Sequence, residues 1–521
     1  MVAACGQVGG DYDAPHMSTV PDSAQQVLKM AFTAHNAGRQ AEAEALCRVL
    51  LGAIPNDPQL LFLLGMVLHR MKRDAEAIPW LKRATELKPG LARNFSGLGL
   101  AFRGAGNEAE AMKNFSRAAA LEPENGSHFY NLGLGWHQLN DPEQARAAFQ
   151  KAVELNPGDV ASWNNLGKIF KHLNRIDDSL AAYDRALAIA PEYELARHGR
   201  AILLLAAGRL GEGFREYESR WSKIRQREYP RPHWHGENRP GETIFLHAEQ
   251  GFGDAIHFAR FVPLARERAG RIILECRPEL KSLFNASKLA DEVVGFGENV
   301  PAFDRFTSII SLPRHLGINE NNVSARVPYL QAPAAGDLPP AKPATLKVGI
   351  VWAGSAKHND DAMRSISLEQ FLPLLQTPGI TFYSLQQVVP ERDKILVHEL
   401  TDVIDLSPRL TDFSATAGLV NQLDLVIAVD TAVAHLAGAL AKPVWTLVQF
   451  DADWRWFGDG EGTVWYPTMR LFRQTRRGDW PPVVARAADA LKKMTTSEMT
   501  VSRKAAQISG QEVVFFADSQ T

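Results

Sequence analysis

Small residues and proline recur at a fixed step through the first two hundred residues. Proline occupies Pro55, Pro89, Pro123, Pro157 and Pro191, each 34 residues after the one before. The same step separates the glycines Gly65, Gly99, Gly133 and Gly167 and the alanines Ala43, Ala77, Ala111 and Ala145. Small residues at a fixed spacing let two antiparallel helices approach closely, and a proline ends the second helix. The pattern predicts helical hairpins over residues 24–191, followed by an imperfect sixth hairpin that runs to about Trp221.

From residue 243 the pattern changes to short runs of β-branched and aromatic residues that alternate with helical stretches. The runs are IFLHA, RIILEC, EVVGF and TSIISL and, after a proline-rich segment, VGIVWAG, ITFYSLQ, DVIDLS, LDLVIAVD and PVWTLVQ. Strands that alternate with helices predict parallel sheets built from βαβ units. We therefore expect two Rossmann-like halves, at residues 243–335 and 345–494, with a last helix over Pro482–Lys493.

The segments around these blocks lack periodicity. Residues 1–22 and 495–521 are expected to be disordered tails, and the three prolines of YPRPHWHGENRP mark a linker over residues 223–242. The repeats then occupy residues 23–222, five complete and one partial. The predicted fold class is α + α/β, a helical solenoid followed by a pair of Rossmann-like domains facing each other across a cleft.

Composition narrows the class of protein further. The net charge is −2, with 22% charged residues, which argues against a nucleic-acid surface or a polybasic membrane anchor. The three cysteines, Cys5, Cys47 and Cys276, are too scattered for a disulfide framework or a zinc site. The amino terminus has no basic segment followed by an apolar run, and no stretch is long and apolar enough to span a membrane. We expect a cytoplasmic protein.

In open parallel sheets, ligands collect at the carboxyl ends of the strands. The run IFLHA leads into a turn containing Gly251, Gly253 and Asp254 and then into a helix. The glycines permit a tight turn and close approach of a ligand to the backbone. Asp254 either faces the cleft or only caps the helix, a role that aspartate performs well.

A second strand-to-helix junction follows LDLVIAVD and contains Asp430, Thr431, Ala432 and His435. The free N–H groups at such a helix start can stabilise a diphosphate without a metal ion. Thr431 can donate its hydroxyl to a phosphate oxygen, and His435 lies one turn further along. The alternative interpretation makes Thr431 an N-cap and His435 a packed helical residue.

The loop after VGIVWAG brings small and cationic residues together beside the hinge. It contains Ser355, Lys357 and Arg364, a composition suited to a pyrophosphate leaving group or to an exposed loop of mixed charge. Gln386, at the end of ITFYSLQ, is added to the predicted donor-binding residues.

Two further motifs are weaker. The triplet Asp451-Ala452-Asp453 spells a metal-binding DxD, but such triplets are common and we predict no metal site here. The second motif is a cluster of large aromatic residues that could stack on a base or a sugar. Because large aromatics usually fill a core, we favour packing between the two halves. The cluster comprises Trp454, Trp456, Trp465 and Tyr466.

These motifs resemble known families. The repeats resemble tetratricopeptide repeats, and the GFGD turn, the GIVWAGS loop and the DTAVAHLAGA block resemble glycosyltransferases of family 9, which are heptosyltransferase-like. The resemblance implies a GT-B fold over roughly Thr243–Leu491, with Asp254 as general base. It also implies that Asp430 and Thr431 contact donor sugar and phosphates, that His435 helps to hold the diphosphate, and that Arg364 or Lys357 supplies the cation.

The fusion of repeats to such a module is also similar to the O-linked N-acetylglucosamine transferases. In that resemblance Asn131 and Asn165, at the same position of successive hairpins, imply binding of a peptide backbone. The short first half implies that the repeats supply part of the acceptor site.

The resulting hypothesis is an inverting glycosyltransferase that needs no metal ion or cofactor and uses a nucleotide-diphosphate sugar as co-substrate. The acceptor would be a hydroxyl on a protein bound by the repeats. Two alternatives stay open: a repeat scaffold whose GT-B module has lost catalysis, and an enzyme of polysaccharide or lipopolysaccharide assembly.

Overall fold

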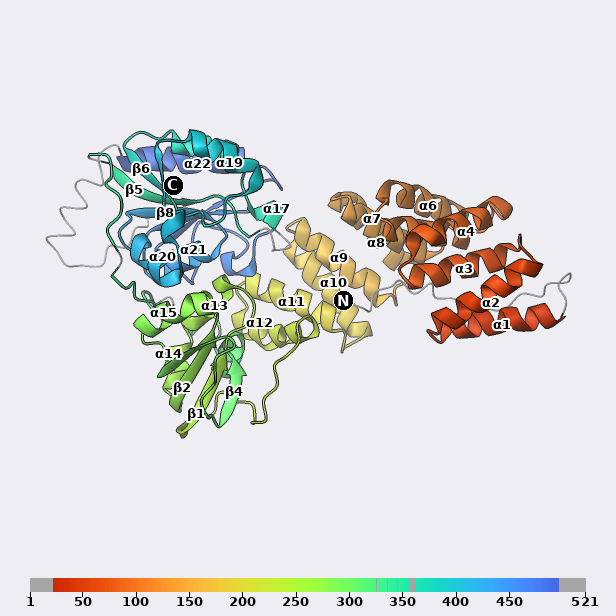
Figure 1. Ribbon diagram of the computed structural model, residues 1–521, viewed down its shortest axis with the longest axis horizontal. Coiled ribbons are helices and arrows are strands. Elements are labelled where there is room, and N and C mark those ends of the chain that lie inside the picture. The colour runs from red at the N-terminus through yellow and green to blue at the C-terminus, as the bar shows by residue number, and fades with distance from the viewer. Residues whose placement is uncertain (1–21, 325, 335, 344, 356–360, 496–521) are drawn as a thin grey trace. The chain divides into compact units, whose positions relative to one another are not determined.

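The computed structural model describes residues 22–324, 326–334, 336–343, 345–355 and 361–495 (Figure 1). The expected tails lie outside the described residues except for Asp22 and Thr495. Two compact units divide between Arg200 and Ala201. No helix in the described ranges is both long and apolar enough to cross a membrane.

The first unit is an array of antiparallel helical hairpins, as the period predicts. Its helices are α1 (Asp22–Asn36), α2 (Gln40–Ala53), α3 (Pro58–Arg70), α4 (Asp74–Leu87), α5 (Ala92–Gly104), α6 (Glu108–Leu121), α7 (Gly126–Gln138), α8 (Pro142–Leu155), α9 (Val160–His172) and α10 (Ile176–Ile189). Each periodic proline lies two residues beyond the end of an even-numbered helix, as Pro89 does beyond Leu87. The prolines therefore terminate helices as expected.

The periodic glycines sit where the two helices of a hairpin touch. A Cβ atom built on Gly99 would lie 2.6 Å from the ring of Phe115, and one on Gly133 would lie 2.7 Å from the ring of Phe149. Gly65 meets Leu81 in the same way and Gly167 meets Tyr183. Glycine is required here because the opposing helix carries a large side chain at the point of closest approach.

The turn inside each hairpin contains one residue with a positive φ, a regularity that the glycine and proline pattern of the sequence does not reveal. The residues at these turns all have φ between 55° and 79°. They are Gly38, Lys72, Gly106, Asn140, Asn174 and Gly208. This left-handed conformation closes the first helix of a hairpin. It recurs at Gly208, so the sixth hairpin keeps the geometry of the others.

The second unit contains two parallel sheets. The four-stranded sheet has the order β3-β2-β1-β4, and the six-stranded sheet has the order β10-β9-β8-β5-β6-β7. The first comprises β1 (Arg239–His247), β2 (Ala269–Cys276), β3 (Glu292–Gly295) and β4 (Arg305–Ser308). The second comprises β5 (Leu346–Val351), β6 (Ile380–Ser384), β7 (Val403–Asp405), β8 (Leu425–Val429), β9 (Val444–Val448) and β10 (Met469–Arg473). Neighbouring strands run parallel throughout both sheets, which gives the α + α/β fold class.

Helices connect and cover the strands of both sheets. With the first sheet are α13 (Phe252–Ala259), α14 (Val262–Arg266), α15 (Pro278–Ala286) and α16 (Leu312–His315). With the second are α17 (Asp361–Arg364), α18 (Leu368–Leu375), α19 (Lys394–Glu399), α20 (Phe413–Val420), α21 (Ala432–Ala439) and α22 (Pro481–Lys493). The last helix, α22, begins at Pro481, one residue before the predicted start at Pro482. The run TSIISL is a strand only up to Ser308, where a short 3-10 helix begins.

The sixth hairpin contains the division between the two units, which falls inside its first helix, whereas the expected boundary is at residue 222. It comprises α11 (Glu194–Ala206), α12 (Leu210–Glu216) and the 3-10 helix η1 (Tyr217–Ser222). Leu205, Leu210 and Phe214 lie in one hydrophobic cluster with strand residues of both sheets. This hairpin is therefore part of the core of the second unit.

The segment 223–242, expected to be a linker, packs against the first sheet. Trp234 is fully buried, and its N–H donates to the carbonyl of Glu237 at 2.9 Å. The ring of Tyr229 lies 4.9 Å from that of Phe306, and β1 already begins at Arg239. Trp234 and Tyr229 therefore hold this segment against the sheet, although its prolines and polar residues suggested a linker.

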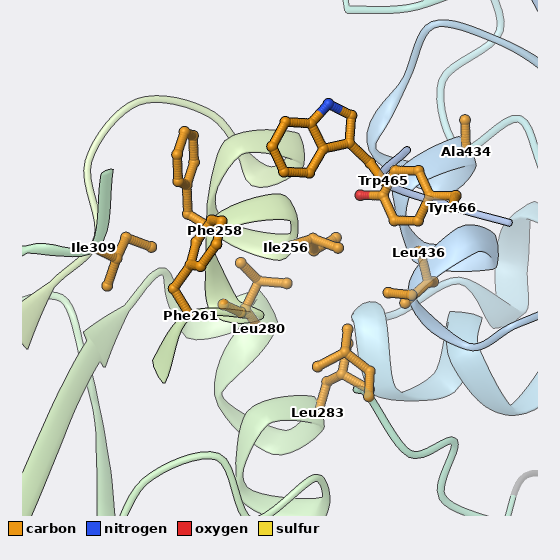
Figure 2. Close-up of a cluster of buried hydrophobic side chains, with 14 of the residues drawn as sticks. Ile256, Phe258, Phe261, Leu280, Leu283, Ile309, Ala434, Leu436, Trp465 and Tyr466 are labelled. Carbon is orange, nitrogen blue, oxygen red and sulfur yellow. The ribbon is translucent and has the colours of Figure 1, made fainter. Parts of the chain in front are cut away.

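The two sheets of the second unit share one core. Ile256 and Phe258 of α13 and Leu283 of α15 meet Leu436 of α21 and Trp465 in the cluster that Figure 2 shows. Trp454, Trp456, Trp465 and Tyr466 are all buried in this cluster, as predicted for packing between the halves. A large apolar interface holds two domains in one arrangement.

Candidate active site

The turn after β1 places Asp254 in the first turn of α13. Asp254 is the third residue of the helix, and its Oδ2 accepts the N–H of Gly251, the N-cap, at 3.0 Å. The capping interpretation of Asp254 therefore holds for one of its two carboxylate oxygens. The side chain keeps 21% of its surface exposed.

The N-terminus of α21 carries the second predicted group. Thr431 is the N-cap, but its side chain makes no capping bond. Its Oγ1 is buried without a hydrogen-bond partner among the described residues. The first N–H groups of a helix have no intrahelical acceptor. The start of α21 therefore combines N–H groups that have no intrahelical acceptor with a buried hydroxyl that has no partner among the described residues.

The two helix starts lie side by side. A Cβ atom on Gly253 would come within 3.0 Å of the His435 ring and 3.8 Å of the Cα of Ala432. Only a residue without a side chain allows α13 and α21 to approach this closely. The predicted glycines of the first half and the predicted helix start of the second half therefore meet.

An arginine that the sequence analysis did not consider joins the two halves at this point. Arg455 donates to Oδ1 of Asp254 at 2.5 Å and to Oδ1 of Asp453 at 2.8 Å, and its side chain is only 7% exposed. Burial opposes its charge, but Asp453 and Asp254 outweigh that effect and hold the pKa of Arg455 above its usual value. The DxD triplet thus contributes an arginine partner, Asp453. No group of three histidine, cysteine or acidic side chains in the described ranges is arranged to hold a metal ion.

The surroundings of Asp430, at the end of β8, disfavour the charged form of its carboxylate. Burial and then repulsion from Asp453 raise its pKa from 3.8 to about 6. Its backbone carbonyl accepts from Nη1 of Arg364 at 3.2 Å. Arg364 in turn lies 3.4 Å from Asp361, within a turn that packs closely against Gly354. Of the two predicted loop cations, Arg364 reaches the site, whereas Lys357 lies outside the described residues.

His435, which the resemblance implies helps to hold the diphosphate, is buried in the structure. It is 5% exposed, and its Nδ1 lies 2.9 Å from the hydroxyl of Tyr466. Burial and the charge of Arg455 lower its pKa to about 3, so the ring is neutral near pH 7. The ring also stacks on Trp456 at 5.0 Å. These contacts fit the alternative interpretation of a packed helical histidine.

Gln386, one of the predicted donor-binding residues, is buried and bonded to the backbone. Its Oε1 accepts from the N–H of Ala353, and its Nε2 donates to the carbonyls of Ala353 and Val388. Two of these bonds fix the backbone just after β5 and the third holds Val388 after β6, so Gln386 positions the loop that follows β5. Ser355 is exposed in that loop.

In the repeats, the two asparagines differ. Asn131 is 8% exposed, whereas Asn165 is half-buried and donates to the carbonyl of Ala161 at 2.9 Å. Oδ1 of Asn165 accepts from Nζ of Lys168. These local partners fix the orientation of the Asn165 amide.

A cavity of about 420 Å³ is lined by residues of both halves. Ser282 of α15 lines it, together with Arg409 and residues at the N-terminus of α20 such as Asp412 and Ser414. The ring of Phe413, next to Asp412, lies 4.9 Å from that of Phe252 at the start of α13. The lining of this cavity is therefore mainly polar, and the element that follows Asp412 contacts the start of α13 through Phe413.

Comparisons with known proteins agree with the two-part organisation. Residues 58–90, 97–160 and 137–194 match family models described as tetratricopeptide repeat, and residues 387–449 match the model described as glycosyltransferase family 9 (heptosyltransferase). The matched segment runs from just after β6 to the end of β9 and so includes Asp430, Thr431 and His435. The chain therefore contains segments similar to tetratricopeptide repeats, followed by a segment similar to glycosyltransferase family 9.

A curated relative matches more than half of the chain. Protein FlbA of Caulobacter vibrioides is 30% identical over 339 residues, which is 58% of this chain and 56% of that protein. The chain thus spans little more than half the length of this relative. Among solved structures, the tetratricopeptide-repeat protein TTC0263 of Thermus thermophilus is 23% identical, with a TM-score of 0.31 over 35% of this chain and 99% of that one. PilF of Pseudomonas aeruginosa is 17% identical, with a TM-score of 0.36 over 39% of this chain and 92% of that one.

Proposed function

We propose that the protein transfers a sugar from a nucleotide-diphosphate donor to an acceptor hydroxyl, with inversion at the anomeric carbon and without a metal ion. The observation that carries this proposal is the start of α21, where the unpartnered Thr431 hydroxyl and the free N–H groups lie beside Arg364. A helix N-terminus and a nearby cation favour a diphosphate by charge and by hydrogen bonds.

Stabilising the departing diphosphate is the main electrostatic demand of this reaction. In the proposed mechanism, Thr431 and the α21 N–H groups bind the phosphates, and Arg364 adds positive charge. His435 supports them through packing, because its ring is neutral. Asp430 would contact the donor sugar at the end of β8.

Asp254 would accept the proton of the acceptor hydroxyl as that oxygen attacks the anomeric carbon. Each of its oxygens accepts one hydrogen bond, from Gly251 and from Arg455. A carboxylate oxygen can accept two, so lone pairs remain for the acceptor hydroxyl. The two bonds fix the orientation of the carboxylate.

Titration calorimetry with uridine, guanosine, adenosine and cytidine diphosphates tests the donor site. We expect at least one to bind, and Thr431→Val to weaken that binding about tenfold, because a hydroxyl bond to a charged phosphate contributes about 1.5 kcal/mol or more. Thr446→Val is the matched control, since Thr446 also has a buried, unpartnered hydroxyl but lies within β9. If both variants bind like the parent protein, the phosphate site is not at Thr431.

Asp254→Asn tests the chemical step. Asparagine can still accept the Gly251 hydrogen bond, so we expect donor binding to persist while transfer falls by about 10²–10⁴, the usual contribution of a general base. Release of nucleoside diphosphate from a panel of nucleotide sugars measures the rate. Near-normal turnover would remove Asp254 from the mechanism.

One observation favours a second candidate function, a repeat scaffold whose sugar-transfer domain no longer catalyses. Both oxygens of Asp254 already serve structural contacts, with the N-cap and with Arg455. In that case none of the nucleoside diphosphates binds, and the calorimetry separates the two functions. For the active enzyme we propose a protein acceptor held by the repeats. An acceptor on a polysaccharide or lipopolysaccharide is the alternative.

A further inference from the structure

The DxD triplet after β9 contains a carboxylate that the proposed mechanism does not use. Asp453 precedes the 3-10 helix η5 (Trp454–Trp456), whose three residues are all buried. The side chain of Asp453 is instead 38% exposed. Its hydrogen bonds all end on Oδ1, from the backbone N–H of Arg455 at 3.0 Å and from Nη1 of Arg455 at 2.8 Å. Oδ2 of Asp453 therefore has no hydrogen-bond partner in the part of the chain that the structure describes.

Arg455 fixes the orientation of the Asp453 carboxylate. The guanidinium carbon of Arg455 lies 4.4 Å from the ring centre of Trp454 and 5.6 Å from that of Phe258, so the guanidinium is packed against two aromatic rings. Its Nη1 donates to Asp453, and its Nη2 donates to Asp254 at 2.5 Å. Asp453 and Asp254 therefore flank one planar, immobile group. A carboxylate held in this way loses little conformational freedom when a ligand binds to it.

Asp453 lies beside the proposed donor site. Burial and then repulsion from Asp453 raise the pKa of Asp430, so the two carboxyl groups are close neighbours. Asp430 immediately precedes Thr431, the N-cap of α21, where the proposed mechanism places the diphosphate. The sugar of a nucleotide-diphosphate donor is bonded directly to that diphosphate. Its hydroxyls therefore come within reach of the carboxylates next to the start of α21.

The charges around Asp453 favour a neutral hydroxyl over a cation as the ligand. Arg455 already binds Oδ1, and Nη1 of Arg364 donates to the carbonyl of Asp430 at 3.2 Å. Both arginines repel a cation, and this repulsion is strong at short range away from bulk water. A hydroxyl instead donates to Oδ2 without adding charge, and hydrogen bonds to a carboxylate are about twice as strong as neutral ones. A sugar supplies several such hydroxyls.

We propose that Oδ2 of Asp453 accepts a hydrogen bond from a hydroxyl of the transferred sugar and thereby helps to select the donor. A site built to bind a hydroxyl strongly rejects an analogue that lacks it, because the polar group of the site is then left without a partner. The inference rests on the proposed transfer reaction and adds a specificity-determining residue to its donor site. The competing account gives Asp453 a structural role only, as a partner of Arg455.

Calorimetric titration of the full-length chain separates the two accounts. It compares each nucleoside diphosphate with its nucleotide sugars, for example uridine diphosphate with uridine diphosphate glucose and uridine diphosphate N-acetylglucosamine. In Asp453→Asn the amide oxygen can still accept from Arg455, while an N–H donor replaces Oδ2. We expect this variant to bind the diphosphate within about twofold of the parent protein and the preferred nucleotide sugar about tenfold more weakly. Asp459→Asn, an exposed position in the same loop, is the matched control and should change neither affinity.

Deoxy analogues of the preferred nucleotide sugar identify the hydroxyl. One analogue should bind the parent protein about tenfold more weakly than the complete sugar does, whereas Asp453→Asn should bind the two with nearly equal affinity. Parent and variant that discriminate equally against every analogue would overturn the assignment.

The diphosphate titrations show which proposal fails. If Asp453→Asn leaves the affinity for the nucleotide sugar unchanged, Asp453 does not contact the sugar. If Asp453→Asn and Asp453→Glu both weaken the diphosphate as much as the nucleotide sugar, the role of Asp453 is structural. In both cases the donor site itself stands. If no nucleoside diphosphate binds the parent protein, the proposed function fails and this inference fails with it.

Discussion

At the scale of single residues, Asp430 has a carboxylate whose charged form is disfavoured by burial, and it also has a proposed role in donor binding. An aspartate whose pKa rises to about 6 on folding binds a proton more tightly in the folded than in the unfolded chain. The free energy of unfolding therefore decreases as pH rises from about 4 to 6, and the loss is complete above that window. Two pKa units correspond to about 3 kcal/mol.

Asp430→Asn should consequently stabilise the second unit at pH 7 by about 1–3 kcal/mol while it lowers donor affinity. At pH 4 the gain should be small, because the folded aspartate is then protonated. Urea unfolding at both pH values measures the effect. Asp412→Asn, which alters a helix cap on α20, provides a control that should not stabilise at either pH. A variant that is no more stable than the parent at pH 7 would contradict this account.

Arg455 is the common ion-pair partner of Asp254 and Asp453 where the two halves meet. Its replacement by methionine leaves Asp254 and Asp453 without their common partner, and breaking a buried pair on one side costs about 3–5 kcal/mol. We expect Arg455→Met to lower the unfolding free energy by that amount, and Arg455→Met with Asp254→Asn to recover part of it. Arg470→Met, which removes an exposed pair with Glu461, should cost less than about 1 kcal/mol. Equal losses in denaturant titrations of Arg455→Met and Arg470→Met would show that the buried pair contributes little.

The sequence predicts the site only as far as local rules extend. Asp254 and Thr431 follow strands at helix starts, and a glycine turn or a β-run reveals such a position without further information. Arg455 is 201 residues from Asp254, and no local rule connects the two. Likewise, the type of residue does not show that His435 is buried and neutral, because burial depends on Trp456 and Tyr466 packing around it.

At the scale of secondary-structure elements, the turn inside each hairpin makes a prediction about glycine. Gly106 has φ 79°, and a Cβ atom added there would meet no atom within 4 Å, so any substitution is opposed by backbone conformation alone. Gly106→Ala should lower the unfolding free energy of the repeats by about 1 kcal/mol. Gly90→Ala is the control, because Gly90 has equal space but no positive φ, and should be neutral or stabilising by up to about 1 kcal/mol.

The equivalent turn in the preceding hairpin makes the reverse change possible. Lys72 has φ 63° at this position. Lys72→Gly relieves the left-handed strain but adds freedom to the unfolded chain, so we expect a change of less than about 0.5 kcal/mol. Thermal unfolding followed by circular dichroism separates these cases. A loss as large as that of Gly106→Ala would show that the lysine side chain, and not the backbone, sets stability at this turn.

The helices of the repeats were predictable because proline and glycine act locally, on a helix end and on one contact with the partner helix. The strand β10 was not predicted, since MRLFR carries two arginines and lacks the β-branched run of its neighbours. Pairing with β9 makes it a strand. For the same reason, the polar residues of YPRPHWHGENRP gave no sign that Trp234 fills a gap against the first sheet.

At the scale of the whole chain, the 34-residue period of the sequence and the contacts of the folded chain place the boundary between the repeats and the second unit at different residues. The 34-residue period continues into the sixth hairpin, so the sequence assigns that hairpin to the repeats. The contacts place the division within α11 and assign the rest of the hairpin to the second unit, where Phe214 meets Trp454 and Trp465. Arg220 of η1 also bonds to Glu249 just before the GFGD turn, at 2.7 Å. The hairpin therefore supports the turn that carries Asp254.

This assignment predicts which fragments fold. A fragment of residues 223–495 loses Leu205, Leu210, Phe214 and Tyr217, each contributing about 1.5–3 kcal/mol of burial, which together approaches the whole stability of a typical domain. It should therefore be unfolded or aggregated, whereas residues 194–495 should melt cooperatively and keep the near-ultraviolet signal of the buried tryptophans. Residues 22–193, as a control, should fold as a helical array by themselves, since each repeat depends only on its neighbours. If 223–495 melts at the same temperature as 194–495, the sixth hairpin is a spacer that contributes nothing to the second unit, and its contacts with the aromatic junction are incidental.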